Sequence, residues 1–169
     1  MSPQVIVRPA RPDEFDAVGE LTVRSYVTGG LLDREDPYVA RLYDAAGRAR
    51  DAELLVATDD TDRLLGTVTV CEPGSPLSEV SRPGELEFRM LAVSPAARGR
   101  GIGELLTRAV LDRAAQRGAR QVVLSSSEWM SVAHRLYTRL GFSRLPDRDW
   151  QPVPGLRLVA FGRSRAADG

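Results

Sequence analysis

The sequence contains no lysine, no asparagine, a single cysteine, a single histidine and no long apolar run. Because Cys71 is alone, an internal disulfide is excluded, and one histidine provides no Cys/His cluster for a structural metal. No apolar run approaches the roughly 18 residues that a membrane-spanning helix needs, and the first residues lack a basic and then apolar leader. We therefore expect a cytoplasmic protein with no metal and no membrane partner.

The charged residues balance, because 23 basic residues, all of them arginine, are matched by 23 acidic residues. A formal net charge of zero gives no global indication of a nucleic-acid partner. The 169 residues, of which 43% are hydrophobic, suffice for one domain with its own core. We predict a single domain over residues 1–162 and a short, flexible polar tail over residues 163–169.

Hydrophobic periodicity and turn residues divide the chain into strands and helices. Strands are predicted at 5–8, 53–58, 64–71, 85–93, 121–125, 142–145 and 156–161, and helices at 12–27, 36–47, 102–117 and 130–140. Pro-containing connections are predicted at 73–84 and 146–154. The order β α α β β β α β α β β predicts a mixed α/β sheet with helices on its faces.

The most informative stretch is the run RGRGIG, which joins the predicted strand ending at Val93 to a strongly periodic helix. Its glycines let backbone amides approach a ligand closely, because no Cβ intervenes. The first turn of a helix offers unpaired N–H groups and the positive end of the helix dipole, which favours an anion such as a phosphate. The candidate anion-binding residues are Arg98, Gly99, Arg100, Gly101, Ile102 and Gly103.

Other interpretations of this run explain less. A tight turn with two solvated arginines accounts for the glycines but not for their coincidence with a strand end and a helix start. A dinucleotide-binding domain needs GxGxxG spacing and a second nucleotide-binding half, and the sequence has neither. A Walker-type loop is excluded, because no Gly-Lys-Ser/Thr occurs in the sequence.

Two motifs in the correct order resemble the signatures of the GNAT acetyltransferase superfamily. Arg98, Gly101 and Gly103 match the pattern Arg/Gln-x-x-Gly-x-Gly/Ala, and MLAVSP at residues 90–95 resembles the strand end that precedes it. Residues 133–142, with Tyr137 near the centre, are similar to the second signature. The resemblance spans roughly residues 85–142, and two signatures at this separation are more specific than either alone.

The resemblance implies a predominantly antiparallel sheet flanked by helices. It also implies an N-acetyltransferase that moves an acetyl group from acetyl-coenzyme A to a primary amine by direct attack in a ternary complex. Residues 98–103 would bind the pyrophosphate. The strand end that would pair with the pantetheine arm comprises Leu91, Ala92 and Val93. The alternative function is a non-catalytic sensor or partner module that binds acyl-coenzyme A.

The expected acceptor is a small-molecule amine or amino acid, because no extended peptide-recognition feature is present. It would be chosen by residues 26–36 and by the connection at 146–155. The acidic side chains of Asp33, Glu35 and Asp36 would attract a cationic amine, although acidic loops are most often only solvated. Similar enzymes commonly dimerise, so a homodimer is one expectation, but no apolar stripe requires it.

Acetyl transfer to an amine needs a base for the amine, a polarised carbonyl and a proton for the departing thiolate. Glu87 is the candidate base, because it shares a strand face with Glu85 and Arg89 and lies where some relatives hold a basic glutamate. The alternative is a solvated face on which Arg89 pairs with Glu85 or Glu87. The opposite face should hold Leu86, Phe88 and Met90.

Tyr137 resembles the tyrosine that relatives use as a general acid toward the coenzyme A thiolate. A phenol with a pKa of about 10 stays protonated at neutral pH and can donate once the thiolate develops. The alternative is a core aromatic side chain. A backbone N–H near Leu91 or Val93 would polarise the thioester carbonyl if the strand bulges there.

The remaining chemistry-bearing side chains are weaker candidates. His134 lies three residues before Tyr137, but a surface histidine is commoner than a catalytic one. Cys71 is interpreted as a small buried hydrophobe. Trp129 and Trp150 could line an acceptor pocket, although large aromatic side chains are more often core.

The second signature contains one departure from the family pattern. Many relatives have an asparagine that can hydrogen-bond the cofactor, and this chain has Met130 there. That contact is therefore absent or supplied by Ser126 or Ser127. The sequence leaves open which amine is the acceptor and whether the acyl group is longer than acetyl.

Overall fold

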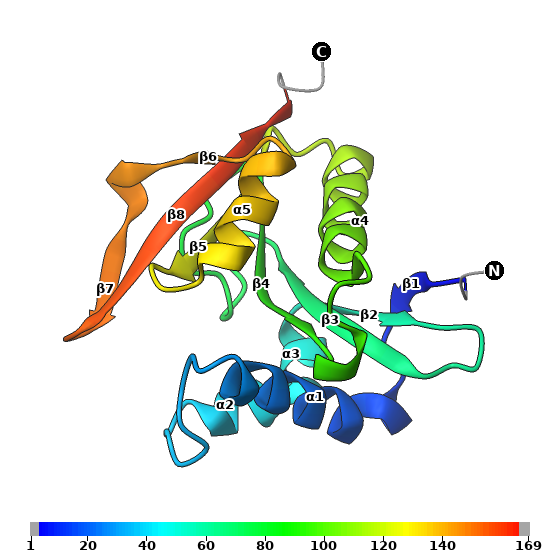
Figure 1. Cartoon of the computed structure of the whole chain (residues 1–169). Helices are drawn as coiled ribbons and strands as arrows, with labels where there is room; N and C mark the ends of the chain where they lie inside the picture. The colour runs from blue at the N-terminus through cyan, green and yellow to red at the C-terminus, as the bar shows by residue number, and fades with distance from the viewer. Residues whose placement is uncertain (1–3, 166–169) are drawn as a thin grey trace.

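The computed structural model describes residues 4–165, which form one central sheet with helices on both faces (Figure 1). Within these residues the sheet has eight strands in the order β1-β2-β3-β4-β5-β8-β6, and β7 also pairs with β8. The strands are β1 Ile6–Pro9, β2 Glu53–Thr58, β3 Leu64–Cys71, β4 Glu85–Val93, β5 Gln121–Ser127, β6 Ser143–Arg144, β7 Trp150–Val153 and β8 Leu156–Ser164.

The central pair of strands, β4 and β5, is parallel, whereas the other pairings within the described sheet are antiparallel. The parallel ladder is short and ends where Glu87 pairs with Val123. Beyond that point β4 continues beside β3 and β5 continues beside β8, so the two central strands part. The predicted mixed α/β fold with a mostly antiparallel sheet is confirmed.

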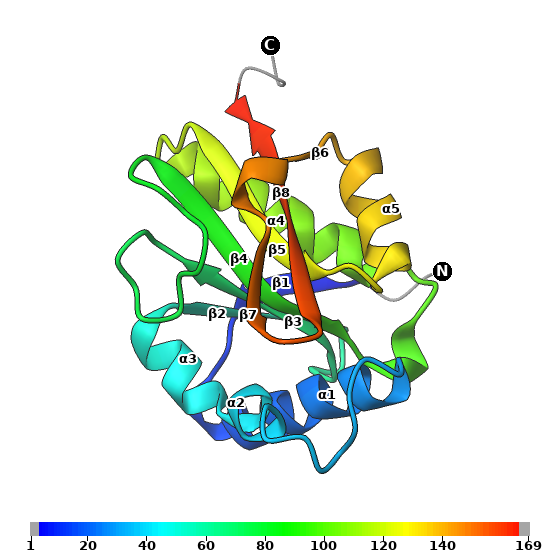
Figure 2. The ribbon, with the colours of Figure 1, turned by 90° about the vertical axis from the view of Figure 1, so that its left-hand side faces the viewer.

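The helices divide between the two faces of the sheet. Figures 1 and 2 show α1, α2 and α3 below the sheet and α4 and α5 on its other face. Their bounds are α1 Phe15–Thr28, α2 Val39–Tyr43, α3 Ala45–Asp51, α4 Ile102–Gln116 and α5 Ser131–Arg139. No helix within residues 4–165 is long and apolar enough to cross a bilayer.

The main core lies between the sheet and α4–α5. The apolar stripe predicted for α4 is buried there, where Leu106 and Val110 pack against Leu86 and Phe88 of β4. Smaller clusters lie under α1–α3. The sheet therefore positions β4 between two separately packed layers.

The helix predicted at 36–47 is wrong in one respect, because two short helices, α2 and α3, replace it. The chain turns at Asp44, whose φ of −78° and ψ of 67° are not helical, and whose side chain accepts a hydrogen bond from the Gly47 amide at 3.0 Å. This N-cap starts α3 afresh. The turn also brings α2 close to α1, since a Cβ at Gly19 would collide with the Tyr43 carbonyl.

The C-terminal part of the sheet is more extensive than predicted. The connection at 146–154 contains the strand β7, which its two prolines obscure in the sequence. Prolines are tolerated on an edge strand, and β7 pairs only with β8 among the described residues. The predicted tail is wrong for Arg163 and Ser164, which belong to β8 and pair with Val122 and Gln121 of β5. The rest of the predicted tail, apart from Arg165, lies outside the described residues.

Candidate active site

The run at residues 98–103 forms the entry to α4. Gly99 and Gly101 have positive φ angles of 78° and 76°, and a Cβ at either position would meet no other atom within 4 Å. Gly101 is the N-cap of α4, without a side-chain hydrogen bond. Leu105 donates to the Gly101 carbonyl at 3.0 Å, and the amides before it in the first turn have no carbonyl within the helix to accept from them. These amides have no partner within the helix and are available to an anion.

The two arginines of this run are exposed beside the helix entry. Arg98 donates to the Ser25 carbonyl of α1 at 3.1 Å, so it links the loop to the helix layer on the other face. No such contact holds Arg100 among the described residues. Both guanidinium groups therefore add positive charge where the helix dipole already favours an anion.

A β-bulge interrupts β4 immediately before this loop. Thr69 pairs with Arg89 and Thr67 pairs with Ala92, so two residues of β4 oppose one residue of β3. Met90 carries the strain, with a φ of 53°. A bulge leaves backbone groups of the extra residue without partners in the ladder, and here it falls where β4 and β5 part.

The bulge also changes which side chains share a face, and the prediction for Met90 is wrong. Up to Phe88 the strand alternates as expected, and Phe88 lies in the main core. After the bulge it is Leu91 and Val93 that pack against this core. Met90 instead packs with Val23 of α1 and with α2, because the extra residue shifts the alternation by one.

Tyr137 lies on α5, in the aromatic part of the main core. Its side chain is buried, and its ring centroid is 5.7 Å from that of Phe88, 5.8 Å from that of Phe142 and 5.9 Å from that of Phe161. Burial, and then the neighbouring Tyr26 phenol on α1, raise the pKa of Tyr137. The phenol is therefore neutral at physiological pH and remains a proton donor.

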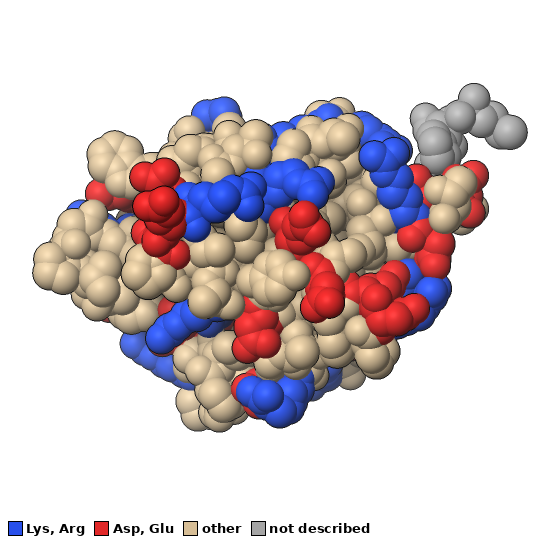
Figure 3. All heavy atoms as spheres, turned by 90° about the horizontal axis from the view of Figure 1, so that it is seen from below, with Lys and Arg blue, Asp and Glu red and all other residues tan. Residues whose placement is uncertain are grey.

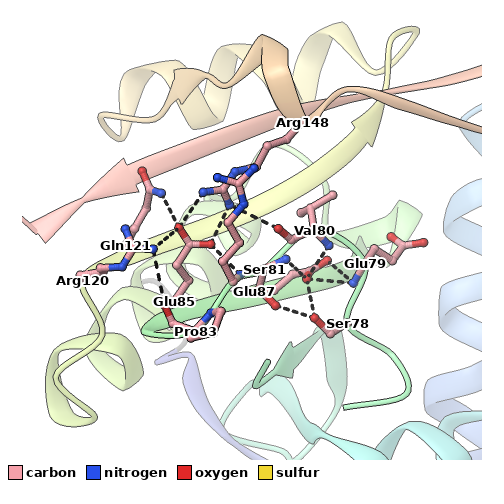
Figure 4. Close-up of polar contacts among 11 residues, drawn as sticks. Ser78, Glu79, Val80, Ser81, Pro83, Glu85, Glu87, Arg120, Gln121 and Arg148 are labelled. Carbon is pink, nitrogen blue, oxygen red and sulfur yellow. Dashed lines mark hydrogen bonds and ion pairs between the residues drawn. The ribbon is translucent and has the colours of Figure 1, made fainter. Parts of the chain in front are cut away.

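Glu87 is completely buried and is the anchor of the loop between β3 and β4 (Figure 4). Its Oε1 accepts hydrogen bonds from the amides of Glu79, Val80 and Ser81 at 3.0, 3.1 and 3.0 Å. Ser78 Oγ donates to the same oxygen at 3.1 Å, and the Glu79 amide also donates to Oε2 at 3.1 Å. The general-base role of Glu87 stays a prediction, and these contacts do not support it.

Glu85 is buried in a second network on the same strand face (Figure 4). Arg148 donates to its two carboxylate oxygens at 2.6 and 2.9 Å, and the Arg82 amide and Gln121 each donate at 2.8 Å. Burial alone would raise the pKa of Glu85, but these hydrogen bonds outweigh it and lower the pKa to about 2. The alternative prediction of a solvated face is therefore wrong.

Arg89 pairs with neither Glu85 nor Glu87, contrary to that same alternative. Its Nε lies 3.0 Å from Oε1 of Glu79, and its other nitrogens donate at 3.0 Å to the Leu77 carbonyl and to the Tyr38 hydroxyl. Glu79 was not among the sequence candidates. It lies in the connection at 73–84, which shows no helix or strand periodicity. The one available signal was its position just before a strand that carries Glu85, Glu87 and Arg89.

The weaker candidates are placed as follows. His134 Nε2 lies 3.2 Å from Ser126 Oγ and its ring packs on Phe161, while burial lowers the pKa of the imidazole. Ser126 also contacts the Met130 sulfur at 3.4 Å, so it does not hold a free hydroxyl in place of the missing asparagine. Cys71 is buried, and burial raises the pKa of its thiol to about 12.

The tryptophans and acidic residues proposed for the acceptor side differ in exposure. Trp129 is 74% exposed and therefore not core, whereas Trp150 is partly buried in β7. Asp33, Glu35 and Asp36 are exposed in the segment after α1. Figure 3 shows that acidic and basic side chains are interspersed on the lower face of the molecule, so that face carries no single sign of charge.

A cavity of about 450 Å³ lies elsewhere, between the start of β2, the end of β3 and the C-terminal part of α4. Its charged lining includes Glu53, Glu72 and Arg117, which are paired with one another. None of the residues predicted to act in the site lines this cavity.

Residues 15–142 match the model of the acetyltransferase (GNAT) family. A mycothiol acetyltransferase from Cellulomonas flavigena is 33% identical over 187 residues, which cover 100% of this chain and 51% of the relative. The chain thus spans about half the length of that relative.

Solved structures with the same fold cover nearly the whole chain. A GCN5-related N-acetyltransferase from Kribbella flavida is 26% identical, with a TM-score of 0.68 over 95% of this chain and 97% of that structure. The PaiA N-acetyltransferase from Thermoplasma acidophilum, solved in complex with coenzyme A, is 15% identical, with a TM-score of 0.74 over 95% and 99%. The second likeness concerns the fold alone.

Proposed function

This chain belongs to the GNAT acetyltransferase family, and we propose that it transfers an acetyl group from acetyl-coenzyme A to a primary amine of a small molecule. The attack is direct, within a ternary complex of enzyme, cosubstrate and acceptor. The observation that carries this proposal is the coincidence, at one end of β4, of a backbone bulge, a parted pair of strands and an open helix N-terminus.

The residues present fit such a cosubstrate. The first-turn amides of α4, which have no partner within the helix, and the two exposed arginines would hold its diphosphate. The backbone of residues 91–93, beyond the bulge, would pair with the pantetheine arm in the opening between β4 and β5. When bound, this group supplies the activated acetyl thioester.

The chain's own groups then support the transfer. An amide freed near Leu91 by the bulge donates a hydrogen bond to the thioester oxygen, which stabilises the charge that develops there. The neutral phenol of Tyr137 donates a proton to the departing thiolate, because sulfur becomes basic as it takes the electron pair of the breaking C–S bond. Water is limited on this side, since Tyr137 is packed among Phe88, Phe142 and Phe161.

A small-molecule acceptor agrees with the name of the Cellulomonas relative, mycothiol acetyltransferase. It also agrees with the exposed acidic residues after α1, which would attract a cation.

The test is release of free thiol from acetyl-coenzyme A with a panel of small amines and amino acids. We expect turnover with at least one amine, and initial velocities that give intersecting lines when both substrates are varied. Parallel lines would indicate an acetylated enzyme and would contradict direct attack. Binding of coenzyme A without thiol release for any amine would identify a sensor module instead.

A further inference from the structure

The loop between β3 and β4 is held by an unusual anchor. Three consecutive backbone amides and one hydroxyl converge on Oε1 of Glu87, and the side chain is completely buried, so it is not accessible to an acceptor. A carboxylate that accepts several backbone N–H bonds is a rigid fixture. Its consequence is that the side chain of Glu79 leaves the loop in a defined direction, away from Glu87 (Figure 4).

Glu79 reaches across the opening between β4 and β5. Its Oε1 lies 3.0 Å from Nε of Arg89 on β4 and 3.4 Å from Oγ of Ser125 on β5. Arg89 and Ser125 each lie two residues beyond the last β4–β5 pair, Glu87 with Val123. Glu79 therefore occupies the point at which the two strands part, opposite the face that carries Tyr137.

The surroundings of Glu79 keep it accessible but poorly solvated. Its side chain is 20% exposed and that of Arg89 is 13% exposed. Its Oε2 accepts no hydrogen bond from another described side chain or amide. Burial raises the pKa of Glu79, and the ion pair with Arg89 opposes this effect.

We propose that Glu79 binds the acceptor's ammonium group and takes the proton that the amine must lose before attack. Arg89 and Ser125 position Glu79 through the same carboxylate oxygen, Oε1, and Glu87 positions the loop that carries it. The inference rests on the proposed function, and it assigns the base to a loop residue that the sequence pattern of β4 does not include.

The step balances as follows. The ammonium group gives one proton to Glu79, and the freed nitrogen lone pair forms the N–C bond with the thioester carbon. The C–S bond breaks, and its electron pair leaves with sulfur. The nitrogen loses a second proton as the amide forms, the thiolate gains one from Tyr137, and the Tyr137 phenol is restored by that second proton. Glu79 returns its proton to solvent, so one proton is released per turnover.

The test compares Glu79→Gln, Glu79→Asp and Glu87→Gln with wild type in the thiol-release assay. Glu79→Gln should lower kcat/KM for the amine by about 10²–10⁴-fold, with the dissociation constant for coenzyme A unchanged. The acidic limb of the kcat/KM profile, where activity falls as the carboxylate is protonated, should disappear. Glu79→Asp should retain the acidic limb with a reduced kcat. If Glu79→Gln folds poorly, this variant tests whether a carboxylate at position 79 is responsible for that limb.

Glu72→Gln is the matched control, because Glu72 lies on the same loop, exposed and paired with Arg117 at 3.0 Å. It should keep wild-type activity. Glu87→Gln should lose activity through displacement of the loop, yet keep the acidic limb.

Other titratable groups face Glu79, so the acidic limb of the kcat/KM profile is assigned to Glu79 by comparing variants. These groups are Arg89 and Glu87 of β4, Cys71 of β3, Tyr38 and Arg41 at α2, and Tyr26 of α1. Full activity with an intact acidic limb in Glu79→Gln would overturn the inference, as would loss of that limb in Glu87→Gln alone. Failure of wild type to bind coenzyme A would instead remove the proposed function, and this inference with it.

Discussion

On the α4–α5 side of the opening between β4 and β5, Phe88 and Tyr137 pack edge to face with their rings at 72°, whereas on the α1–α3 side the same strand presents Glu85, Glu87 and Arg89. The first side is apolar packing and backbone amides. The second side is a network of charged groups, most of them buried. Glu85 and Glu87 each accept several hydrogen bonds, and Arg89 donates to the Leu77 carbonyl and the Tyr38 hydroxyl. Under the proposed function, cosubstrate binding depends on backbone conformation, and acceptor chemistry depends on a few positioned charged side chains.

The largest effect on the apolar side is expected from Tyr137→Phe. Loss of the hydroxyl removes the proposed donor to the thiolate, so kcat should fall by about 10²–10⁴-fold. Stability should change little, because the ring contacts with Phe88, Phe142 and Phe161 remain. The measurement is thiol release at saturating substrates, with urea unfolding as the control for folding. Wild-type kcat in a stable variant would show that the donor lies elsewhere.

On the charged side, Arg148→Met should lower the free energy of unfolding by about 3–5 kcal/mol at pH 7, because buried Glu85 loses its closer arginine partner at 2.6 Å and keeps only the exposed Arg120 at 3.4 Å. The pKa of Glu85 is lowered from its usual 4.5 to about 2 in the folded protein. Its stabilising contribution is therefore complete above about pH 4.5 and is lost as the pH falls toward 2. The difference in the free energy of unfolding between Arg148→Met and wild type should therefore become smaller as the pH falls through that range.

Urea unfolding of both proteins at several pH values between 7 and 3 measures this effect. Arg157→Met is the matched control, because Arg157 is 57% exposed and its pair with Asp149 is expected to contribute less than about 1 kcal/mol. If Arg148→Met lost no more unfolding free energy than Arg157→Met, the Glu85 network would contribute little to stability.

A smaller effect separates backbone strain from ligand binding. Gly101→Ala places a Cβ at a φ of 76°, which should lower the free energy of unfolding by about 1–2 kcal/mol and weaken coenzyme A binding about tenfold. Gly155→Ala is matched to it, since Gly155 has a φ of 83° and equally open surroundings in the β7–β8 turn. Gly155→Ala should lower the free energy of unfolding by a similar amount and leave the affinity for coenzyme A unchanged. If calorimetry gave Gly101→Ala and Gly155→Ala the same affinity for coenzyme A, the role proposed for the entry to α4 would be contradicted.

The smallest effect concerns the exposed arginines. Arg98→Ala should weaken coenzyme A binding by only a few-fold, about 0.5–1 kcal/mol, because exposed charges are screened. The loss should shrink further as salt is added. Arg108→Ala, on the exposed side of α4, is the control and should bind as wild type does. A loss that is insensitive to salt would indicate a structural role through Ser25 instead.

The same contrast explains what the sequence could predict. Strand β4 and the helix α4 were predicted with bounds within a residue, because period-two and period-3.6 patterns and the glycines at 99–103 are local signals. The entry to α4 was predicted for the same reason. The bulge at Met90 was only a conditional expectation, since one extra residue in a strand has no signature in composition.

The charged side could not be predicted, because it depends on segments that are distant in the chain. Glu85 meets Arg148, and Arg89 meets Glu79 and Tyr38, only after the loop at 73–84 and the turn after β6 fold over the strand. Alternation placed these side chains on one face but could not say what covers it. The prediction of a solvated face failed for that reason.

The most direct test of the account is calorimetric titration of acetyl-coenzyme A into the wild-type protein. We expect saturable uptake of one equivalent per chain, weakened by added salt because the diphosphate is held partly by exposed positive charge. Absence of uptake by a folded sample, checked by equilibrium dialysis with coenzyme A itself, would contradict the binding site at the entry to α4.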